Sequence, residues 1–143
     1  LWVAGCTHKC KGCHNPVTWD IEGGIPFDDA AKEELFEELK KDYVSGVTFS
    51  GGDPFHLENR EEIGALAKEI REKFPDKTIW LYTGYEWEEI CHLSFLSNID
   101  VIVDGKFKIE EKDNNLHWKG SANQRVIDVK ASLRAGEVRL YQE

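Results

Sequence analysis

The sequence contains no methionine, no long apolar run and little positive charge. Its apolar N-terminal stretch, Leu1 to Gly5, is far too short for a signal peptide or a membrane span, which disfavours a membrane role. Because position 1 is leucine, we expect the natural N-terminus to be missing, and an export signal could have been lost with it. The 18 lysines and arginines against 27 aspartates and glutamates give a net charge of −9, which disfavours nucleic-acid binding through a basic surface.

Cysteine is also scarce, and its distribution is uneven. Three of the four cysteines fall within eight residues, whereas a secreted disulfide scaffold would spread more cysteines through a shorter chain. We therefore expect a reducing, cytoplasmic compartment in which the cysteines are thiols or metal ligands. The length of 143 residues, with no internal repeat or low-complexity tract, predicts one domain over residues 1–143.

Strand-like and helix-like segments alternate along the chain. Apolar runs predict strands at 1–4, 47–49, 78–82, 100–103, 125–129 and 137–141. Two helices are predicted by apolar periodicity, the first capped by Asp28 or Asp29, and a third helix begins near Glu86. Their apolar faces are expected to carry Ala31, Leu35, Leu39 and Tyr43 in the first helix and Ile63, Leu66, Ala67, Ile70 and Phe74 in the second.

This alternation predicts an α/β fold of parallel β/α units. About five to six mainly parallel strands are too few for a closed eight-stranded barrel, so we predict an open, partial β/α barrel in a single domain. The carboxyl ends of parallel strands meet at one edge of the sheet, where ligands gather. The residues that directly follow predicted strands are Cys6, Gly51, Gly52, Asp53, Thr83, Gly84, Asp104 and Gly105.

The cysteine cluster has the spacing Cys6-x3-Cys10-x2-Cys13 in a loop that also contains glycine. A structural zinc site needs four protein ligands, and His8 or His14 could supply the fourth. The other reading is an iron–sulfur cluster with three thiolates and one iron open to an outside ligand. Cys91 lies far along the chain, in a predicted helix, and is expected to be a buried free thiol.

The rest of the chain resembles a known family. The C-x3-C-x2-C spacing after a first strand is similar to the radical S-adenosylmethionine superfamily, and SGGDP at 50–54 resembles its GGE motif. CHNPVTWD at 13–20 resembles the glycyl-radical-enzyme activases. TFSGGDPF at 48–55, LYTGY at 81–85, DVIVDGKF at 100–107 and GSANQRVIDV at 120–129 together resemble the activating enzymes of anaerobic, class III ribonucleotide reductases. Gly12, before the third cysteine, and Asp53, in place of glutamate, depart from the superfamily pattern.

The resemblance implies a radical S-adenosylmethionine core domain over residues 1–143. Cys6, Cys10 and Cys13 match the ligands of a 4Fe–4S cluster whose open iron binds S-adenosylmethionine, and the hard chemistry belongs to these two groups rather than to a catalytic side chain. The positions implied to contact S-adenosylmethionine are His14, Asn15, Ser50, Gly51, Gly52, Asp53, Thr83, Gly84 and Arg125. From the residues alone, Ser50 to Asp53 could equally be a plain strand-to-helix turn, and Asp104 and Gly105 could simply close one.

The resemblance also implies partners. The substrate would be the large catalytic subunit of an anaerobic ribonucleotide reductase, offering a glycine on its C-terminal loop, and the electron donor a flavodoxin or ferredoxin. We expect docking over the strand-end rim that carries 6–15, 51–54 and 123–125. Two alternatives stay open: an activase of another glycyl radical enzyme, such as pyruvate formate-lyase, and a non-catalytic zinc- or cluster-binding docking module.

Overall fold

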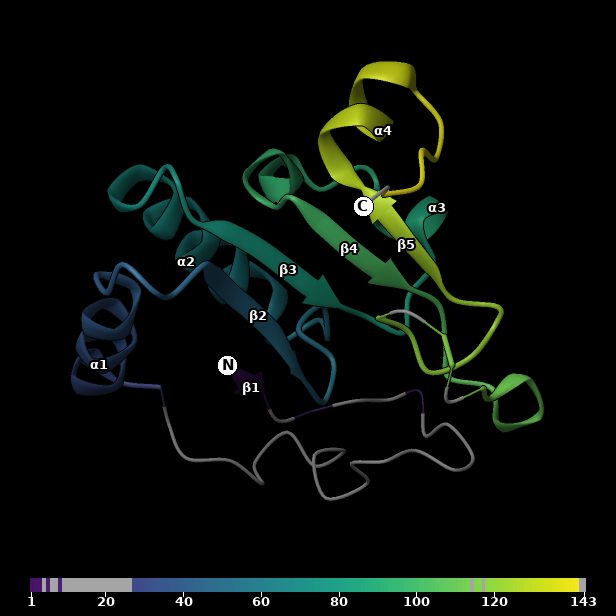
Figure 1. Ribbon diagram of the computed structural model, residues 1–143, viewed down its shortest axis with the longest axis horizontal. Helices are drawn as coiled ribbons and strands as arrows, with labels where there is room; N and C mark the ends of the chain where they lie inside the picture. The colour runs from purple at the N-terminus through teal and green to yellow at the C-terminus, as the bar shows by residue number, and fades with distance from the viewer. Residues whose placement is uncertain (4, 6–7, 9–26, 114, 117, 142–143) are drawn as a thin grey trace.

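The computed structural model describes residues 1–3, 5, 8, 27–113, 115–116 and 118–141. Five strands form one sheet in the order in which they occur along the chain: β1 (Trp2–Val3), β2 (Gly46–Gly51), β3 (Thr78–Tyr82), β4 (Val101–Asp104) and β5 (Arg125–Asp128). Strands β1 to β4 are parallel, and β5 pairs antiparallel with β4. In Figure 1 the arrowheads of β2, β3 and β4 point the same way and that of β5 points back.

The predicted parallel pairing of the strands before Gly51 and Gly84 is thus confirmed. A sheet whose neighbours follow chain order has no point where the order reverses, in contrast to a doubly wound sheet. The carboxyl ends of β1 to β4 therefore share one edge, which we call the strand-end rim. Its described residues are those that directly follow Gly51, Tyr82 and Asp104, together with Gly5 after β1. A partial barrel remains a prediction.

The helices connect these strands. They are α1 (Asp29–Leu39), α2 (Arg60–Lys73), α3 (Trp87–Ile90) and α4 (Val129–Ala135), with short 3-10 helices η2 (Ser94–Asn98) and η3 (Ile109–Glu111). The predicted cap of α1 is Asp28, whose Oδ1 accepts a hydrogen bond from Ala31 N at 2.9 Å. Helix α3 begins after Glu86, as predicted. In the described part of the chain, no helix combines the length and apolarity needed to cross a membrane.

Helix α1 ends earlier than its apolar periodicity predicts. Its last residue is Leu39, and Tyr43, expected on the apolar face, is 79% exposed. The ammonium of Lys77 donates to the backbone carbonyls of Lys41 and Val44 and thereby fixes the turn into β2. A side chain distant in sequence therefore decides where this helix stops, which local periodicity cannot reveal.

The core lies between one face of the sheet and α2. Register places Phe49 beside Leu81 and Leu81 beside Ile102, and all three are fully buried. Helix α2 crosses behind the sheet in Figure 1. It buries four apolar residues that its 3.6-residue periodicity predicts, Ile63, Leu66, Ala67 and Ile70.

The last predicted strand, Glu137–Tyr141, is wrong. Leu140 forms only an isolated bridge with Ile127 and is 59% exposed. The predicted strand over 125–129 is correct as far as Asp128, whose side chain caps α4 by accepting from Ala131 N. Helix α4 ends at Gly136, in the left-handed conformation (φ 72°) that favours glycine. Residues 137–141 then run back along β5 and make too few ladder contacts for a full strand.

Candidate functional site

The candidate site is the strand-end rim at β1, β2 and β3. The predicted metal ligands Cys6, Cys10 and Cys13 and the predicted cofactor contacts His14 and Asn15 lie outside the described residues. Gly5 and His8, on either side of Cys6, are described. Their contacts therefore show where the cysteine-bearing loop, residues 5–15, is attached.

Asp53 is the polar centre of this rim and is only 1% exposed. Its Oδ1 accepts hydrogen bonds from Phe55 N at 2.9 Å and Thr83 Oγ1 at 2.8 Å. Its Oδ2 accepts from Gly84 N at 2.9 Å and His8 Nε2 at 2.6 Å. A buried carboxylate is tolerated when its lone pairs are satisfied in this way. We call Asp53 with these four donors the Asp53 cluster.

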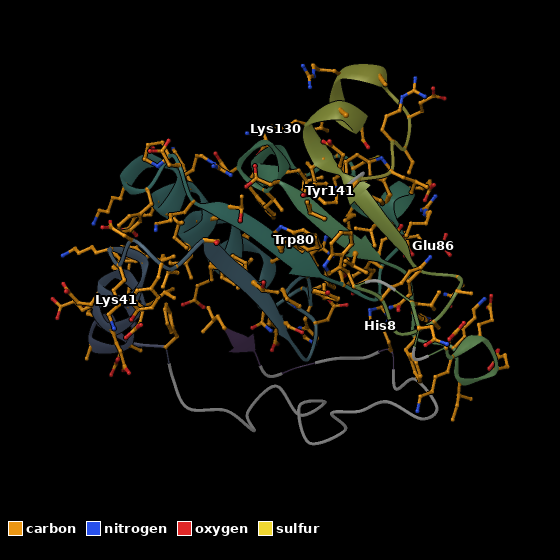
Figure 2. All side chains as sticks on the ribbon, in the orientation of Figure 1. His8, Lys41, Trp80, Glu86, Lys130 and Tyr141 are labelled. Atoms are coloured by element: carbon orange, nitrogen blue, oxygen red, sulfur yellow. The ribbon has the colours of Figure 1, made fainter. Side chains whose placement is uncertain are left out.

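His8 fits closely into this cluster, and Figure 2 shows it beyond the arrowhead of β3. Its ring meets that of Tyr85 edge-to-face, with centroids 4.7 Å apart. The ring also packs against Gly84, where it fills the space that a side chain would need. A Cβ built at Gly84 would lie 2.3 Å from His8 Cδ2. Gly84 is therefore required at this position because the histidine ring occupies the space of its missing side chain.

One backbone bond attaches the same loop a second time, and another closes the turn after β2. Asp53 N donates to Gly5 O at 2.7 Å, and His56 N donates to Asp53 O at 2.9 Å. Gly5 and Gly51 have φ values of 104° and 99°, which other residues adopt only with strain. The sharp turns at the ends of β1 and β2 thus depend on glycine and bring the two loops together.

The other predicted cofactor contacts occupy different places on the rim. Ser50 and Gly51 end β2, and Ser50 N donates to Leu1 O at 2.9 Å. Gly52 follows them and is partly buried. Thr83 is buried, and its hydroxyl both donates to Asp53 and accepts from Tyr85 N at 3.2 Å. The structure therefore brings 50–53, 83 and 84 together, as the parallel sheet predicts.

Arg125 lies elsewhere on the rim, at the junction of β4 and β5. Its guanidinium donates to both carboxylate oxygens of Asp104, and its Nη1 and Nη2 donate to Glu88 at 3.1 and 2.8 Å. The hydrogen bonds that Arg125 donates to Glu88, the larger cause, and to Asp104 raise the pKa of Arg125 further above its ordinary value. Arg125 is thus engaged by two protein carboxylates and makes no described contact with the Asp53 cluster.

Asp104 is as buried as Asp53 and serves this second cluster. In addition to the guanidinium of Arg125, its carboxylate accepts hydrogen bonds from two backbone nitrogens, that of Trp87 at 2.8 Å and that of Arg125 at 3.1 Å. It ties the start of α3 to the end of β4. The sequence left open whether Asp104 faces a ligand at the rim or only closes a turn, and these contacts favour the structural role. We call Glu88, Asp104, Arg125 and the Trp87 amide the Asp104 cluster.

The GSANQR segment forms a hydrogen-bonded loop beside the Asp104 cluster. Gln124 Oε1 accepts from the backbone nitrogens of Gly120 and Ser121, and its Nε2 donates to Gly105 O at 2.9 Å. Asn123 Nδ2 donates to Lys106 O at 2.8 Å. Both amide side chains therefore fasten the chain that leaves β4 to the chain that enters β5.

Two further predictions concern isolated residues. Cys91, expected as a buried thiol, is exposed at the C-terminal cap of α3, because that helix is only four residues long and ends there. Within the described ranges, no three His, Cys, Asp or Glu side chains are grouped so as to hold a metal ion. Sequence reasoning missed the role of His8, which it considered only as a zinc ligand, and those of Tyr85 and Arg60, whose guanidinium lies 5.3 Å from the Tyr85 ring.

Comparisons with known proteins extend this picture. A family model described as a 4Fe-4S single cluster domain matches residues 1–127. The chain is 45% identical to the anaerobic ribonucleoside-triphosphate reductase-activating protein of Enterobacteria phage T4, over 88% of this chain and 80% of the relative. It is 42% identical to the protein of that name from Haemophilus influenzae and 40% identical to that from Escherichia coli K12, in both cases over 88% of this chain and 84% of the relative.

No solved structure matches the chain significantly. The matched region includes the cysteine-bearing loop, the Asp53 cluster and the end of β4. The identity of 40–45% extends over most of this chain and most of each relative, and the family model covers the same region. This chain belongs to the anaerobic ribonucleoside-triphosphate reductase-activating proteins, a family with a 4Fe-4S cluster domain.

Proposed function

We propose that this chain is an enzyme that activates an anaerobic ribonucleoside-triphosphate reductase, by cleaving S-adenosylmethionine reductively and generating a glycyl radical on the reductase. The observation that carries the proposal is the attachment of the cysteine-bearing loop to the strand-end rim through Gly5 and His8. The relatives bear the name of that activity, and the matching family model describes a 4Fe-4S cluster domain.

The donor set fits such a cluster. Cys6, Cys10 and Cys13 offer three thiolates, which are the protein ligands that iron–sulfur clusters use. The described neighbours Gly5 and His8 hold the beginning of this loop directly against β2 and β3. A 4Fe–4S cluster held by these thiolates would supply a binding site for S-adenosylmethionine and pass on the electron for its reductive cleavage from the flavodoxin or ferredoxin. The protein's own task is to hold both groups in register and to exclude water.

The geometry suggests how the rim would receive S-adenosylmethionine. Asp53 already accepts four hydrogen bonds from protein donors, so its side chain has little capacity left for a ligand ammonium. We propose that backbone atoms of Ser50, Gly51 and Gly52 make the contacts to the methionine end, with His14 and Asn15 as further contacts. Thr83 and Gly84 would then support the site through Asp53, and Arg125 through the shape of the rim.

We further propose that the reductase docks over the strand-end rim of an open, partial barrel and inserts its glycine loop there. A glycine must come within contact distance of the cofactor, which requires an open mouth. Reversing the charge of Arg125 would destroy the Asp104 cluster, so the better probe is Lys106, an exposed residue that follows β4. Lys106→Glu should lower glycyl-radical yield. Lys40→Glu, on the exposed end of α1, should not; the opposite result would place docking on another face.

The direct experiment is anaerobic reconstitution of the chain with iron and sulfide, followed by incubation with the reductase, S-adenosylmethionine and a flavodoxin or ferredoxin, the electron donors expected in a reducing cytoplasm. Electron paramagnetic resonance should detect a glycyl radical on the reductase. Cys10→Ala should abolish it, and Cys91→Ala should leave it unchanged because Cys91 is exposed and distant in sequence from the loop. A radical formed on pyruvate formate-lyase instead, or stoichiometric zinc without radical, would contradict the proposal.

A further inference from the structure

The chemistry of the proposed site leaves one buried contact unexplained, the hydrogen bond between His8 and Asp53. The two side chains are 7% and 2% exposed, and their atoms are 2.6 Å apart. Neither thiolate ligation nor backbone contacts to S-adenosylmethionine require a histidine at this position. A buried polar pair of this kind needs a reason, because an apolar pair would avoid the cost of desolvation.

The Asp53 cluster joins three loops that follow three neighbouring strands. His8 comes from the loop after β1, Phe55 N from the loop after β2, and Thr83 and Gly84 from the loop after β3. All of these donors converge on one carboxylate. Removal of a single donor leaves the others in place, whereas the histidine is the only described side chain through which the cysteine-bearing loop reaches Asp53.

The position of the histidine within the loop makes this contact consequential. His8 lies two residues after Cys6 and two before Cys10, and Gly5, next to Cys6, is bonded to Asp53 N. The loop is therefore attached to Asp53 on both sides of Cys6. Packing also fixes the ring of His8. The Tyr85 ring contacts it edge-to-face, and Gly84 leaves room for it because glycine has no side chain.

We propose that His8 is a positioning residue whose hydrogen bond to Asp53 holds the cysteine-bearing loop in register with the ends of β2 and β3. The bond fixes His8, which lies between Cys6 and Cys10 in the sequence, against the loop that follows residues 50–52, where the proposed function places S-adenosylmethionine. The inference therefore rests on the proposed function for its consequence, but the link itself is a property of the metal-free chain.

A competing role for His8 is direct metal ligation through Nδ1. Histidines that bind zinc commonly donate their other ring N–H to a carboxylate, which is the contact that His8 makes. The two roles predict different behaviour for a glutamine at this position. Its side-chain amide can donate to Asp53 but cannot replace an imidazole as a metal ligand.

The experiment compares His8→Gln with His8→Leu in the full chain. The two side chains are similar in size, and only glutamine can donate to Asp53. His92→Gln serves as control, since His92 is exposed. Hydrogen exchange of the metal-free proteins reports on the Gly84 amide, which donates to Asp53. We expect exchange at least about tenfold faster in His8→Leu and close to the unchanged chain in His8→Gln and the control.

The second readout uses the reconstituted proteins. Iron and sulfide per chain should be equal in all four proteins, with one cluster signal of unchanged spectroscopic character. The dissociation constant for S-adenosylmethionine should rise about tenfold in His8→Leu and recover in His8→Gln, and this recovery is an effect that side-chain volume alone would not produce.

Two results would overturn the inference. If both His8 variants lose iron or alter the cluster spectrum in the absence of S-adenosylmethionine, His8 is a metal ligand. If His8→Gln behaves like His8→Leu in both exchange and affinity, the hydrogen bond does not position the loop. A failure of the proposed function looks different, because the unchanged chain would then show the exchange pattern but neither bind S-adenosylmethionine nor produce a radical.

Discussion

The Asp53 and Asp104 clusters begin from the same local feature and end in different roles. Each aspartate is 1% exposed and lies where a parallel strand ends. Asp53 is satisfied by a histidine, a hydroxyl and two backbone amides from three loops. Asp104 is satisfied mainly by one arginine, which also reaches the exposed Glu88. The first arrangement attaches the cysteine-bearing loop to the strand-end rim through His8, and the second connects the ends of β4 and β5.

This difference teaches that position on the rim does not by itself decide function. An arginine supplies several donors from one rigid group and can satisfy a carboxylate alone. Among the described residues, the contacts of the Asp104 cluster are made without Gly5 or His8, the two described residues of the cysteine-bearing loop. The Asp53 cluster lacks a lysine or arginine donor among the described residues, so its completeness depends on His8. Substitutions can separate these two roles.

The largest effect is expected from Asp53→Asn. The substitution preserves shape, but one side-chain oxygen becomes an amino group that opposes two buried donors. Because each unsatisfied buried donor costs about 1–3 kcal/mol, the free energy of unfolding should fall by about 3 kcal/mol. Urea denaturation of the metal-free chain measures this. Reconstitution should show reduced iron content because, unlike His8→Leu, the substitution also leaves a backbone amide of a neighbouring loop without its acceptor. Full stability would mean that the cluster is dispensable.

Asp104→Asn should destabilise the chain less and leave iron content unchanged. Arg125 keeps its bidentate contact with Glu88, so only part of the network is lost. We expect a decrease of about 2 kcal/mol in the free energy of unfolding. The same urea and iron measurements apply. Equal loss of iron in the Asp104 and Asp53 variants would erase the functional distinction between the clusters.

Gly84→Ala tests the fit of His8 against Gly84 by steric crowding. The new methyl group would lie 2.3 Å from His8 Cδ2, so the ring must move, at a cost of about 1–3 kcal/mol. Gly136→Ala is the matched control, because no atom lies within 4 Å of its Cβ and only its φ of 72° is unfavourable. Faster amide exchange around Asp53 should appear in the first variant alone. If Gly136→Ala gives the same exchange pattern, crowding of His8 is not its cause.

The smallest effect concerns the exposed part of the Asp104 cluster. A hydrogen bond and charge from Arg125 lower the pKa of Glu88 below its ordinary value of 4.5. The resulting stabilisation is therefore present above pH 4.5 and disappears as the pH falls through the lower, folded-state pKa. Glu88 is largely exposed, so the contribution should stay below about 1 kcal/mol.

Comparing the urea stability of the unchanged chain and Glu88→Gln between pH 7 and pH 3 measures this contribution. The two curves should converge at the acid end. A difference that grows as the pH falls would mean that Arg125 does not stabilise the ionised carboxylate.

Much of the scaffold follows from local sequence patterns. The apolar run Thr78–Tyr82 forms a strand with the predicted bounds, and α2 buries its predicted face. Failures occur where a distant partner decides the outcome, as when Lys77 fixes the turn after α1 or the peptide after Gly136 runs past β5 without forming a full strand. Because β2 and β3 are parallel neighbours, residues 51–53 after β2 lie close to Thr83 and Gly84 after β3. This proximity could be predicted from the ends of the strands alone.

Individual contacts at the site were less predictable. The SGGDP motif marks Asp53 as a candidate contact of S-adenosylmethionine, but no local pattern shows that Asp53 accepts from a histidine and Asp104 from an arginine. The partner of His8 lies far along the chain, and so does the reason why residue 84 must be glycine. Such pairings depend on the register between strands, which the sequence pattern constrains only to within a few residues.

The short first strand has a consequence for the order in which the protein assembles. The connection between β1 and β2, residues 4–45, is longer than those between β2 and β3, residues 52–77, and between β3 and β4, residues 83–100, and it must close before Trp2 can pair with Ser50. Longer loops cost more entropy to close, and a two-residue strand returns little in exchange. We therefore expect β1 to join last. Cys6, Cys10 and Cys13, which follow β1 in the sequence, would then be organised late, and until that moment their thiols would be open to oxidation.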